Sequence, residues 1–211
     1  QAGDGYAAYI GGSTAQATHA MNEWWGKNGM GTMPHALIQL FKGDTVAAAK
    51  AYHEVYPEDD LTVLVDYNND VITDALKVAD EFGDTLKCVR LDTSGNMVDK
   101  YFLRNAHLLG KFDPRGVNPE LIFALREALD KEGYQHVKIM ASGGLTEEKI
   151  RMFENRNVPV DLYGVGRNLL DINIGFTGDN VILNGEFRET RITATFRPAA
   201  TSTAAKPTWI R

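Results

Sequence analysis

Short apolar runs of strand type alternate with helical patterns along most of this chain. The runs are rich in Val, Ile and Leu and fall at residues 61–65, 86–91, 137–140 and 158–163. Between them, apolar residues recur every three or four positions, which is the period of a helix with one buried face. This α/β alternation predicts a parallel sheet with right-handed crossovers, as part of a (β/α) barrel or as an open doubly wound sheet. We take the barrel as the primary expectation.

The segment after Asn118 carries the clearest helical signal. Asn118 is a preferred N-cap, Pro119 suits the first helical position, and Gly133 ends the pattern. A second helix is predicted over residues 71–82. By contrast, residues 6–12 near the start of the chain are interpreted as a strand and a turn.

Polar clusters follow the predicted strands at their carboxyl ends. They comprise Asp66–Asp70, Asp92–Gly95, Ser142–Gly144 and Gly164–Arg167. In a barrel the carboxyl ends of all strands open on one face, so we expect the four clusters to converge there.

Two of these clusters carry paired glycines directly after an apolar strand. Their sequences are Ala141-Ser142-Gly143-Gly144-Leu145 and Tyr163-Gly164-Val165-Gly166-Arg167. Unshielded backbone N–H groups in such a turn can close around phosphate oxygens where the next helix begins. A single glycine turn can serve the backbone alone, because glycine adopts positive φ without strain. Two such phosphate cups on successive strands favour a phosphosugar ligand over structural turns.

Composition narrows the classes of function. The chain has 211 residues, 44% of them apolar and 24% charged, and a formal net charge of −6. This acidic balance argues against nucleic acid as a main partner, although local N–H groups can still hold an anionic small molecule. No run approaches the roughly 20 apolar residues that span a bilayer, and the first residues lack the features of a signal peptide. We therefore expect no membrane contact. A single cysteine, Cys88, excludes an internal disulfide, which fits a protein of the reducing cytoplasm.

Five motifs, in this order, resemble those of nicotinate phosphoribosyltransferases. They are Gly31-Thr32-Met33-Pro34-His35-Ala36, Arg90-Leu91-Asp92-Thr93-Ser94-Gly95, Lys111-Phe112-Asp113-Pro114-Arg115-Gly116, and the two phosphate cups. The resemblance divides the chain into a partial barrel over residues 1–185 and a C-terminal extension over residues 186–211. It implies an irregular TIM-like barrel of the type II phosphoribosyltransferase kind, in a homodimer or larger assembly with shared active sites.

The resemblance also implies an activity. The enzyme would transfer the phosphoribosyl group of PRPP to nicotinate, giving nicotinate mononucleotide and diphosphate for NAD salvage, coupled to ATP hydrolysis. His35, expected at the carboxyl end of a short strand, would accept the γ-phosphoryl of ATP, since neutral imidazole is a good nucleophile near pH 7. Asp92 would lie near the ribose hydroxyls. Asp66 and Asp70 would orient Mg²⁺ through water, although their local sequence departs from the family's Asp-Thr-Tyr-Asp pattern.

The phosphates of PRPP would be held in the two cups and in the polar cluster after the second strand. Arg167 would add a cation that grips the 5′-phosphate with two hydrogen bonds. The predicted PRPP-binding set is Thr93, Ser94, Gly95, Ser142, Gly143, Gly144, Gly164, Gly166 and Arg167.

The sequence leaves two alternatives open. One keeps the chemistry but takes nicotinamide or quinolinate as the base, because the family's base-stacking position would precede Gln1. The other is a non-catalytic phosphosugar-binding or assembly half-chain, since about five or six βα units can be counted where a barrel has eight. An enzyme would then need an N-terminal half, from the same protein or from a second chain. The connection over residues 96–116 is interpreted equally as a lid or as a surface excursion.

Overall fold

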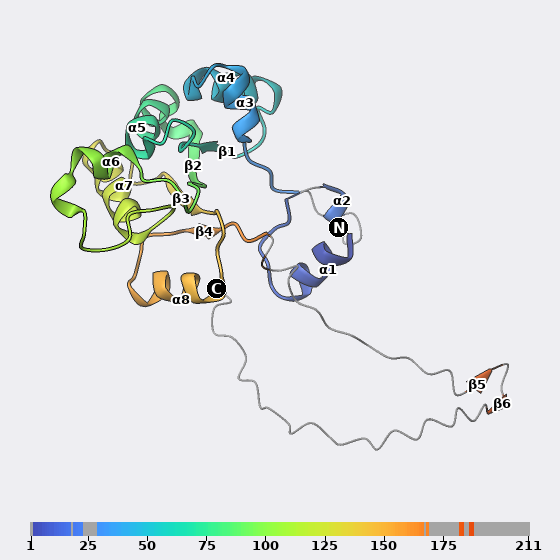
Figure 1. The fold of residues 1–211 in the computed structure, drawn as a ribbon. Coiled ribbons are helices and arrows are strands. Elements are labelled where there is room, and N and C mark those ends of the chain that lie inside the picture. Colours follow the sequence, from blue (N-terminus) through green and yellow to red (C-terminus); the bar gives the residue numbers. More distant parts are fainter. Residues whose placement is uncertain are drawn as a thin grey trace.

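A four-stranded parallel sheet organises the fold, with its strands in the order β1-β2-β3-β4 (Figure 1). The structure is a computed structural model that describes residues 2–17, 19–22, 29–166, 168, 182–183 and 186–187. The strands are β1 (Leu61–Leu64), β2 (Leu86–Leu91), β3 (Lys138–Ala141) and β4 (Leu162–Tyr163), and a separate antiparallel pair is formed by β5 (Ile182–Leu183) and β6 (Glu186–Phe187). The expected α/β chain with a parallel sheet is confirmed.

The order of the strands also bears on the two architectures considered. A doubly wound sheet reverses its strand order at a switch point, whereas these four strands neighbour one another in the order of the sequence. Sequential order is what a segment of a barrel would show. Among the described residues, however, β1 and β4 are the two ends of an open sheet, so the barrel itself is not confirmed.

Helices precede the sheet and connect its strands. They are α1 (Ala2–Ile10), α2 (His19–Asn22), α3 (His35–Leu40), α4 (Thr45–Val55), α5 (Val71–Phe82), α6 (Lys100–Arg104), α7 (Pro119–Lys131) and α8 (Glu147–Asn155), with short 3-10 turns η2 (Gly83–Thr85) and η3 (Ala106–Leu108). No helix in the described ranges is long and apolar enough to cross a membrane.

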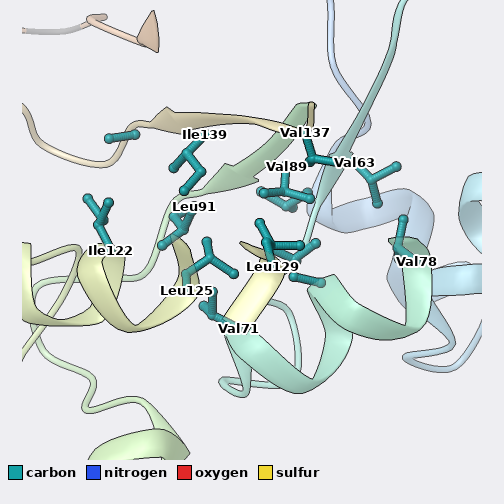
Figure 2. Packing of buried hydrophobic residues seen from close by; sticks show 14 of the residues in the cluster. Val63, Val71, Val78, Val89, Leu91, Ile122, Leu125, Leu129, Val137 and Ile139 are labelled. Atoms are coloured by element: carbon teal, nitrogen blue, oxygen red, sulfur yellow. The ribbon is translucent and has the colours of Figure 1, made fainter. Parts of the chain in front are cut away.

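One face of the sheet packs against α5 and α7 (Figure 2). Alternate strand residues point to this face, because side chains along a strand alternate between its two sides. Burying each such Val, Leu or Ile contributes about 1.5–3 kcal/mol, so this layer holds the helices on the sheet. The side chains that meet here are fully buried: Val63, Val89, Leu91 and Ile139 from the strands, with Val71, Val78, Ile122, Leu125 and Leu129 from the helices.

The two predicted helices form where their end signals place them. Asn118 accepts a hydrogen bond from the backbone N–H of Leu121 at 3.0 Å, and Pro119 is the first residue of α7. The other, α5, ends at Gly83, whose φ of +49° favours glycine. The local end signals therefore agree with the tertiary structure in both helices.

The strand expected over residues 6–12 is wrong, because residues 2–10 form helix α1. Tyr6, Tyr9 and Ile10 follow the spacing of a helical face, and the rings of Tyr6 and Tyr9 lie 6.4 Å apart. The helix ends at Gly11, whose N–H donates to the carbonyl of Ala7 at 2.9 Å. Two adjacent alanines, which are strong helix formers, add to this preference.

The strand expected over residues 158–163 is shorter than its apolar pattern, since β4 contains only Leu162 and Tyr163. Pro159 has no N–H to donate to a ladder. The N–H of Val160 donates to the carbonyl of Val158 at 2.8 Å, which bends the chain locally. Asp161 then accepts the N–H of Ile139 at 2.8 Å through its side chain.

The connection over residues 96–116 closes on itself. The N–H of Gly116 donates to the carbonyl of Met97 at 2.8 Å, which joins the two ends of the connection. Its buried residue Phe102 packs edge-on against Phe112, with ring centroids 5.3 Å apart. These contacts favour a folded surface excursion over a lid.

Candidate active site

The polar clusters converge because the strands keep their two-residue alternation past their ends. The register aligns Leu64, Arg90 and Met140 across β1, β2 and β3. Two residues further along each strand lie Asp66, Asp92 and Ser142, on the face opposite α5 and α7. Ladder hydrogen bonds continue into this region, such as that from the N–H of Ser142 to the carbonyl of Leu91 at 2.8 Å. The first three polar clusters therefore meet at the carboxyl edge, as expected.

Arg90 joins three segments of the chain at this edge. Its Nε donates to Oγ of Ser142 at 3.0 Å, its Nη1 to Oγ1 of Thr32 at 2.7 Å, and its Nη2 to Oδ2 of Asp92 at 2.5 Å. The guanidinium is mostly buried, with 22% of the side chain exposed. A planar fork with several fixed donors suits such a junction better than a lysine would.

The first phosphate cup lies directly after β3. Ser142 is buried, and its hydroxyl donates to the carbonyl of Leu91 at 2.8 Å. Gly143 and Gly144 have φ angles of +84° and +64°, a conformation that side-chain-bearing residues adopt only with strain. Within the described residues, no hydrogen bond takes up the backbone N–H of either glycine. These two donors are therefore available to an anion.

The second phosphate cup lies beside the first. The N–H of Gly164 donates to the carbonyl of Ala141 at 2.8 Å, and a Cβ added to Gly164 would lie 3.0 Å from Cβ of Ser142. Glycine is thus required for the close approach of the two turns. Gly166 is exposed, and Arg167 lies outside the described residues, so its predicted contact with the 5′-phosphate stays a prediction.

The polar cluster after β2 combines a buried and an exposed part. Thr93 is 3% exposed, and its Oγ1 is buried without a hydrogen-bond partner in the described part of the chain. Ser94 and Gly95 are exposed. Gly95 packs against Gly116, because a Cβ added to Gly116 would lie 3.1 Å from the Cα of Gly95. The assignment of these three residues to PRPP stays a prediction.

His35 faces Asp66 at the same edge. Its Nε2 lies 3.5 Å from Oδ1 of Asp66, and 46% of the His35 side chain is exposed against 3% for Asp66. The expectation that His35 ends a strand is wrong, because residues 29–34 form no strand and His35 is the first residue of α3. Pro34, with extended backbone, precedes the helix and turns the chain at this point.

The carboxylate of Asp66 is held in an unfavourable environment. Burial raises its pKa above the ordinary value, His35 acts in the opposite direction, and the carboxylate of Asp92 raises it again. Oδ1 of Asp66 accepts no hydrogen bond among the described residues. A buried carboxylate that lacks such partners gains most from a nearby cation or an N–H donor.

Asp70 has a different neighbourhood from Asp66. Arg104 donates to both of its oxygens, at 2.8 Å and 2.5 Å, and this pairing lowers the pKa of Asp70. Asp70 would have to break the ion pair to bind Mg²⁺, whereas Oδ1 of Asp66 accepts no hydrogen bond from the described residues and has only the 3.5 Å contact with His35. In the described ranges no three His, Cys, Asp or Glu side chains gather closely enough to hold a metal ion. The magnesium site therefore stays a prediction, and Asp66 fits it better than Asp70.

Comparison with known proteins places this geometry in context. The chain is 30% identical to nicotinate phosphoribosyltransferase of Bacillus subtilis (strain 168) over 169 residues, covering 78% of this chain and 29% of that protein. It is 29% identical to nicotinate phosphoribosyltransferase pncB2 of Mycobacterium tuberculosis (strain ATCC 25618 / H37Rv) over 167 residues, covering 77% and 31%. The resemblance to nicotinate phosphoribosyltransferases is confirmed. No family model matches the chain.

A solved structure agrees with the sequence comparison. The crystal structure of nicotinate-nucleotide pyrophosphorylase from Pyrococcus furiosus superposes with a TM-score of 0.61 and 35% identity, covering 77% of this chain and 37% of that one. The chain spans about three tenths of the length of the nicotinate phosphoribosyltransferases it matches.

Two residues of this site were missed in the sequence. Arg90 and Thr32 stand within the motifs that carry the resemblance, but neither was assigned a role. A signal for Arg90 was present, because a charged residue stands inside an otherwise apolar strand. Thr32 gives no comparable signal, since its contact with Arg90 joins residues 58 positions apart.

Proposed function

We propose that this chain forms the phosphate-handling part of a nicotinate phosphoribosyltransferase. The enzyme transfers the phosphoribosyl group of PRPP to nicotinate, releases diphosphate and couples this transfer to ATP hydrolysis. The observation that carries the proposal is the junction at Arg90, which brings together three of the motif segments that carry the resemblance. The sheet would supply consecutive strands of an irregular TIM-like barrel, completed by the rest of the enzyme, in an assembly of two or more subunits.

The phosphate cups would anchor PRPP. The N–H groups of Gly143 and Gly144 point from a turn that precedes α8, where backbone donors favour a phosphate. Arg167 would add a charge-assisted pair of hydrogen bonds. Anchoring the 5′-phosphate fixes the ribose, so that the anomeric carbon meets the base in one orientation.

Asp92 would act on the ribose. As the bond from the anomeric carbon to the diphosphate oxygen breaks and the pyridine nitrogen bonds to that carbon, positive charge develops on the sugar ring. A carboxylate held in place stabilises that charge without having to reorganise. Arg90 holds Oδ2 of Asp92, and Oδ1 faces Gly143 in the first cup. The phosphate anchor and the carboxylate are thus in contact with each other.

His35 would accept the γ-phosphoryl group of ATP. Because Nε2 faces the Asp66 carboxylate, the proton of the neutral ring is favoured on Nε2 and the lone pair on Nδ1. Nδ1 attacks the γ-phosphorus, the bond to the ADP oxygen breaks, and ADP leaves. Asp66 stabilises the positive ring that results, and water later removes the phosphoryl group as inorganic phosphate.

Mg²⁺ would accompany the phosphates of ATP and PRPP, and Asp66 is the side chain that fits it best. Its buried Oδ1 lacks a hydrogen-bond partner within the described residues, and Mg²⁺ commonly binds through one or two carboxylates, several waters and substrate phosphates. When bound, the ion would neutralise negative charge on the phosphate groups during the transfer step.

Phosphorylation of His35 tests the proposal directly. We expect γ-labelled ATP to leave an acid-labile, base-stable label on His35 of the full-length protein, as the Nδ1 isomer by NMR. His35→Asn should abolish the label and the ATP stimulation of nicotinate mononucleotide synthesis, while slow transfer without ATP survives. His136→Asn, at the opposite end of the sheet beside Gly83, is the matched control and should change neither.

Other results would overturn the proposal. A label on another residue, or coupled ATP hydrolysis in His35→Asn, would remove the phosphohistidine step. Product formation with nicotinamide or quinolinate in place of nicotinate would assign a different base. Absence of any transfer by the full-length protein would favour a non-catalytic phosphosugar-binding role.

A further inference from the structure

One side-chain amide links the loop after β1 to the turn between α3 and α4. Nδ2 of Asn68 donates to the backbone carbonyl of Gly43 at 2.9 Å and to Oδ2 of Asp74 at 2.7 Å. The same carboxylate oxygen lies 3.4 Å from Oγ1 of Thr45, the first residue of α4. We call these four residues, Gly43, Thr45, Asn68 and Asp74, the amide clamp.

The amide clamp is closely packed. A Cβ added to Gly43 would lie 3.1 Å from Oδ1 of Asn68 and 3.3 Å from Cε1 of Tyr67, and φ at Gly43 is +88°. Thr45 and Asp74 are each only 4% exposed. A hydrogen bond to a buried carboxylate is stronger than one between neutral groups, and its loss would leave Asp74 with only the longer contacts to Thr45 and Lys77, both at 3.4 Å. The turn is therefore fixed against the loop after β1.

The amide clamp lies at the far end of the helix that begins with His35. Helix α3 has six residues, Ile38 in its middle is fully buried, and the N–H of Gly43 donates to the Ile38 carbonyl at 3.0 Å. At about 1.5 Å per residue, such a helix is a short rigid rod. A displacement of the turn at Gly43 is thus transmitted to His35.

The loop after β1 carries both the residue that faces His35 and the residue that holds the turn after α3. Asp66 and Asn68 are two residues apart, and Asp66 faces Nε2 of His35 at 3.5 Å while Asn68 holds the other end of α3. That distance is longer than an ordinary hydrogen bond. A shift of about 1 Å can reduce a rate about 100-fold when it misplaces a reacting group.

We propose that Asn68 is a positioning residue that keeps His35 opposite Asp66 and so sets the rate at which His35 is phosphorylated. The step it serves rests on the proposed function, but the geometry does not. Thr32, held by Arg90, fixes the chain on the other side of His35. Between these two anchors, the contact with Asp66 orients the imidazole.

The tautomer of His35 in the full-length protein tests the geometry without ATP. Nitrogen-15 chemical shifts of the neutral ring should show the Nε2–H form in the wild-type protein, and a mixture of both forms in Asn68→Ala and Asp66→Asn. Asn105→Ala removes an amide that donates to the Tyr101 carbonyl at 2.9 Å in α6, and this matched control should keep the wild-type shifts. Wild-type shifts in a folded Asn68→Ala protein would overturn the proposal.

The rate of labelling tests the consequence. With γ-labelled ATP, we expect Asn68→Ala to slow His35 phosphorylation 10- to 100-fold and to change the KM for PRPP less than twofold, because the phosphate cups lie on other strands. Asn105→Ala should match the wild-type rate. Equal slowing by both variants, or an unchanged rate in Asn68→Ala, would refute a positioning role.

Two further outcomes keep the tests separate. If the wild-type protein takes no label on His35, the proposed ATP coupling fails and the tautomer measurement alone decides the role of Asn68. If Asn68→Ala does not fold, Asn68→Ser, which keeps one short donor, takes its place and should give an intermediate tautomer ratio. Wild-type shifts in that variant would also overturn the proposal.

Discussion

Gly143 in the first phosphate cup lies directly against Asp92. A Cβ added to Gly143 would be 3.0 Å from Oδ1 of Asp92 and 3.3 Å from its backbone carbonyl oxygen. Its neighbour Gly144 also has a positive φ, but an added Cβ there would meet nothing within 4 Å. The two glycines therefore separate the effect of backbone strain from the effect of displacing Asp92.

Gly143→Ala should damage both stability and transfer. Positive φ costs a residue with a side chain about 1–2 kcal/mol, and overpacking adds about 1–3 kcal/mol. Because relief of the clash moves Asp92, we expect kcat for transfer to fall at least tenfold. Urea unfolding and steady-state kinetics of the full-length protein measure the two effects.

Gly144→Ala is the matched control for this substitution. It should lose only the strain energy of about 1–2 kcal/mol and retain the position of Asp92. Equal losses of kcat in the two variants would show that the contact between Gly143 and Asp92 has no functional weight.

Arg90→Lys should weaken the junction while keeping its charge. Lysine cannot reach Thr32, Asp92 and Ser142 together, so at least one partner loses a hydrogen bond, at about 1.5–3 kcal/mol when a charged group is involved. We expect kcat/KM for PRPP to fall about 100-fold, equivalent to about 2.7 kcal/mol.

Arg126 provides the control for Arg90. Its guanidinium donates to the carbonyls of Tyr134 and Val137, away from the carboxyl edge of the sheet. Arg126→Lys should lower the free energy of unfolding without changing kcat/KM. If Arg90→Lys behaves in the same way, Arg90 is a structural residue alone.

Much of the scaffold could be predicted from local pattern. The apolar run at residues 86–91 became β2 without change, and Asn118 with Pro119 placed the start of α7. These predictions succeeded because caps and strand-forming runs act over a few residues. The convergence of the polar clusters also followed, since parallel strands bring their carboxyl ends to one edge.

What could not be predicted depends on contacts between distant residues or on competing local preferences. No pattern reveals that Asn68 reaches Gly43, because the bond joins residues 25 positions apart. At residues 6–12, aromatic residues that suit a strand also suit the spacing of a helix, and the helix prevailed. His35 was expected at the end of a short strand because it directly follows residues 31–34, whereas it is the first residue of helix α3, directly after Pro34.

The difference in unfolding free energy between Asp66→Asn and the wild-type protein should change with pH. The folded-state pKa of Asp66 is raised, chiefly by burial, so folding disfavours the ionised form. The wild-type protein therefore loses stability from this residue as pH rises from below the unfolded pKa, near 3.9, through the raised folded value. Asn does not titrate, and the variant should gain relative stability between pH 4 and pH 7.

Urea unfolding of both proteins at the two pH values measures this difference. The same variant should lose His35 phosphorylation, so that the residue trades stability for activity. A stability difference that does not change with pH would mean that Asp66 is not held in an unfavourable environment.

Arg167→Ala should weaken PRPP binding specifically. If the guanidinium grips the 5′-phosphate, its removal costs about 1.5–3 kcal/mol, the scale of a hydrogen bond to a charged group. Calorimetry with PRPP and with nicotinate measures the two affinities, and only the first should change. Arg151→Ala is a suitable control, because Arg151 is exposed and pairs with Glu147 on α8. Unchanged PRPP affinity in Arg167→Ala would remove the residue from the site.

The alternation along β2 divides the demands on neighbouring residues. Val89 and Leu91 face the helices and are fully buried, whereas Arg90 between them and Asp92 after them lie on the opposite face of the sheet. Adjacent residues therefore meet unlike requirements: one set must match in volume and hydrophobicity, and the next must carry a particular functional group. A stabilising redesign can thus repack every second position of the strand and leave the chemistry of the intervening ones intact.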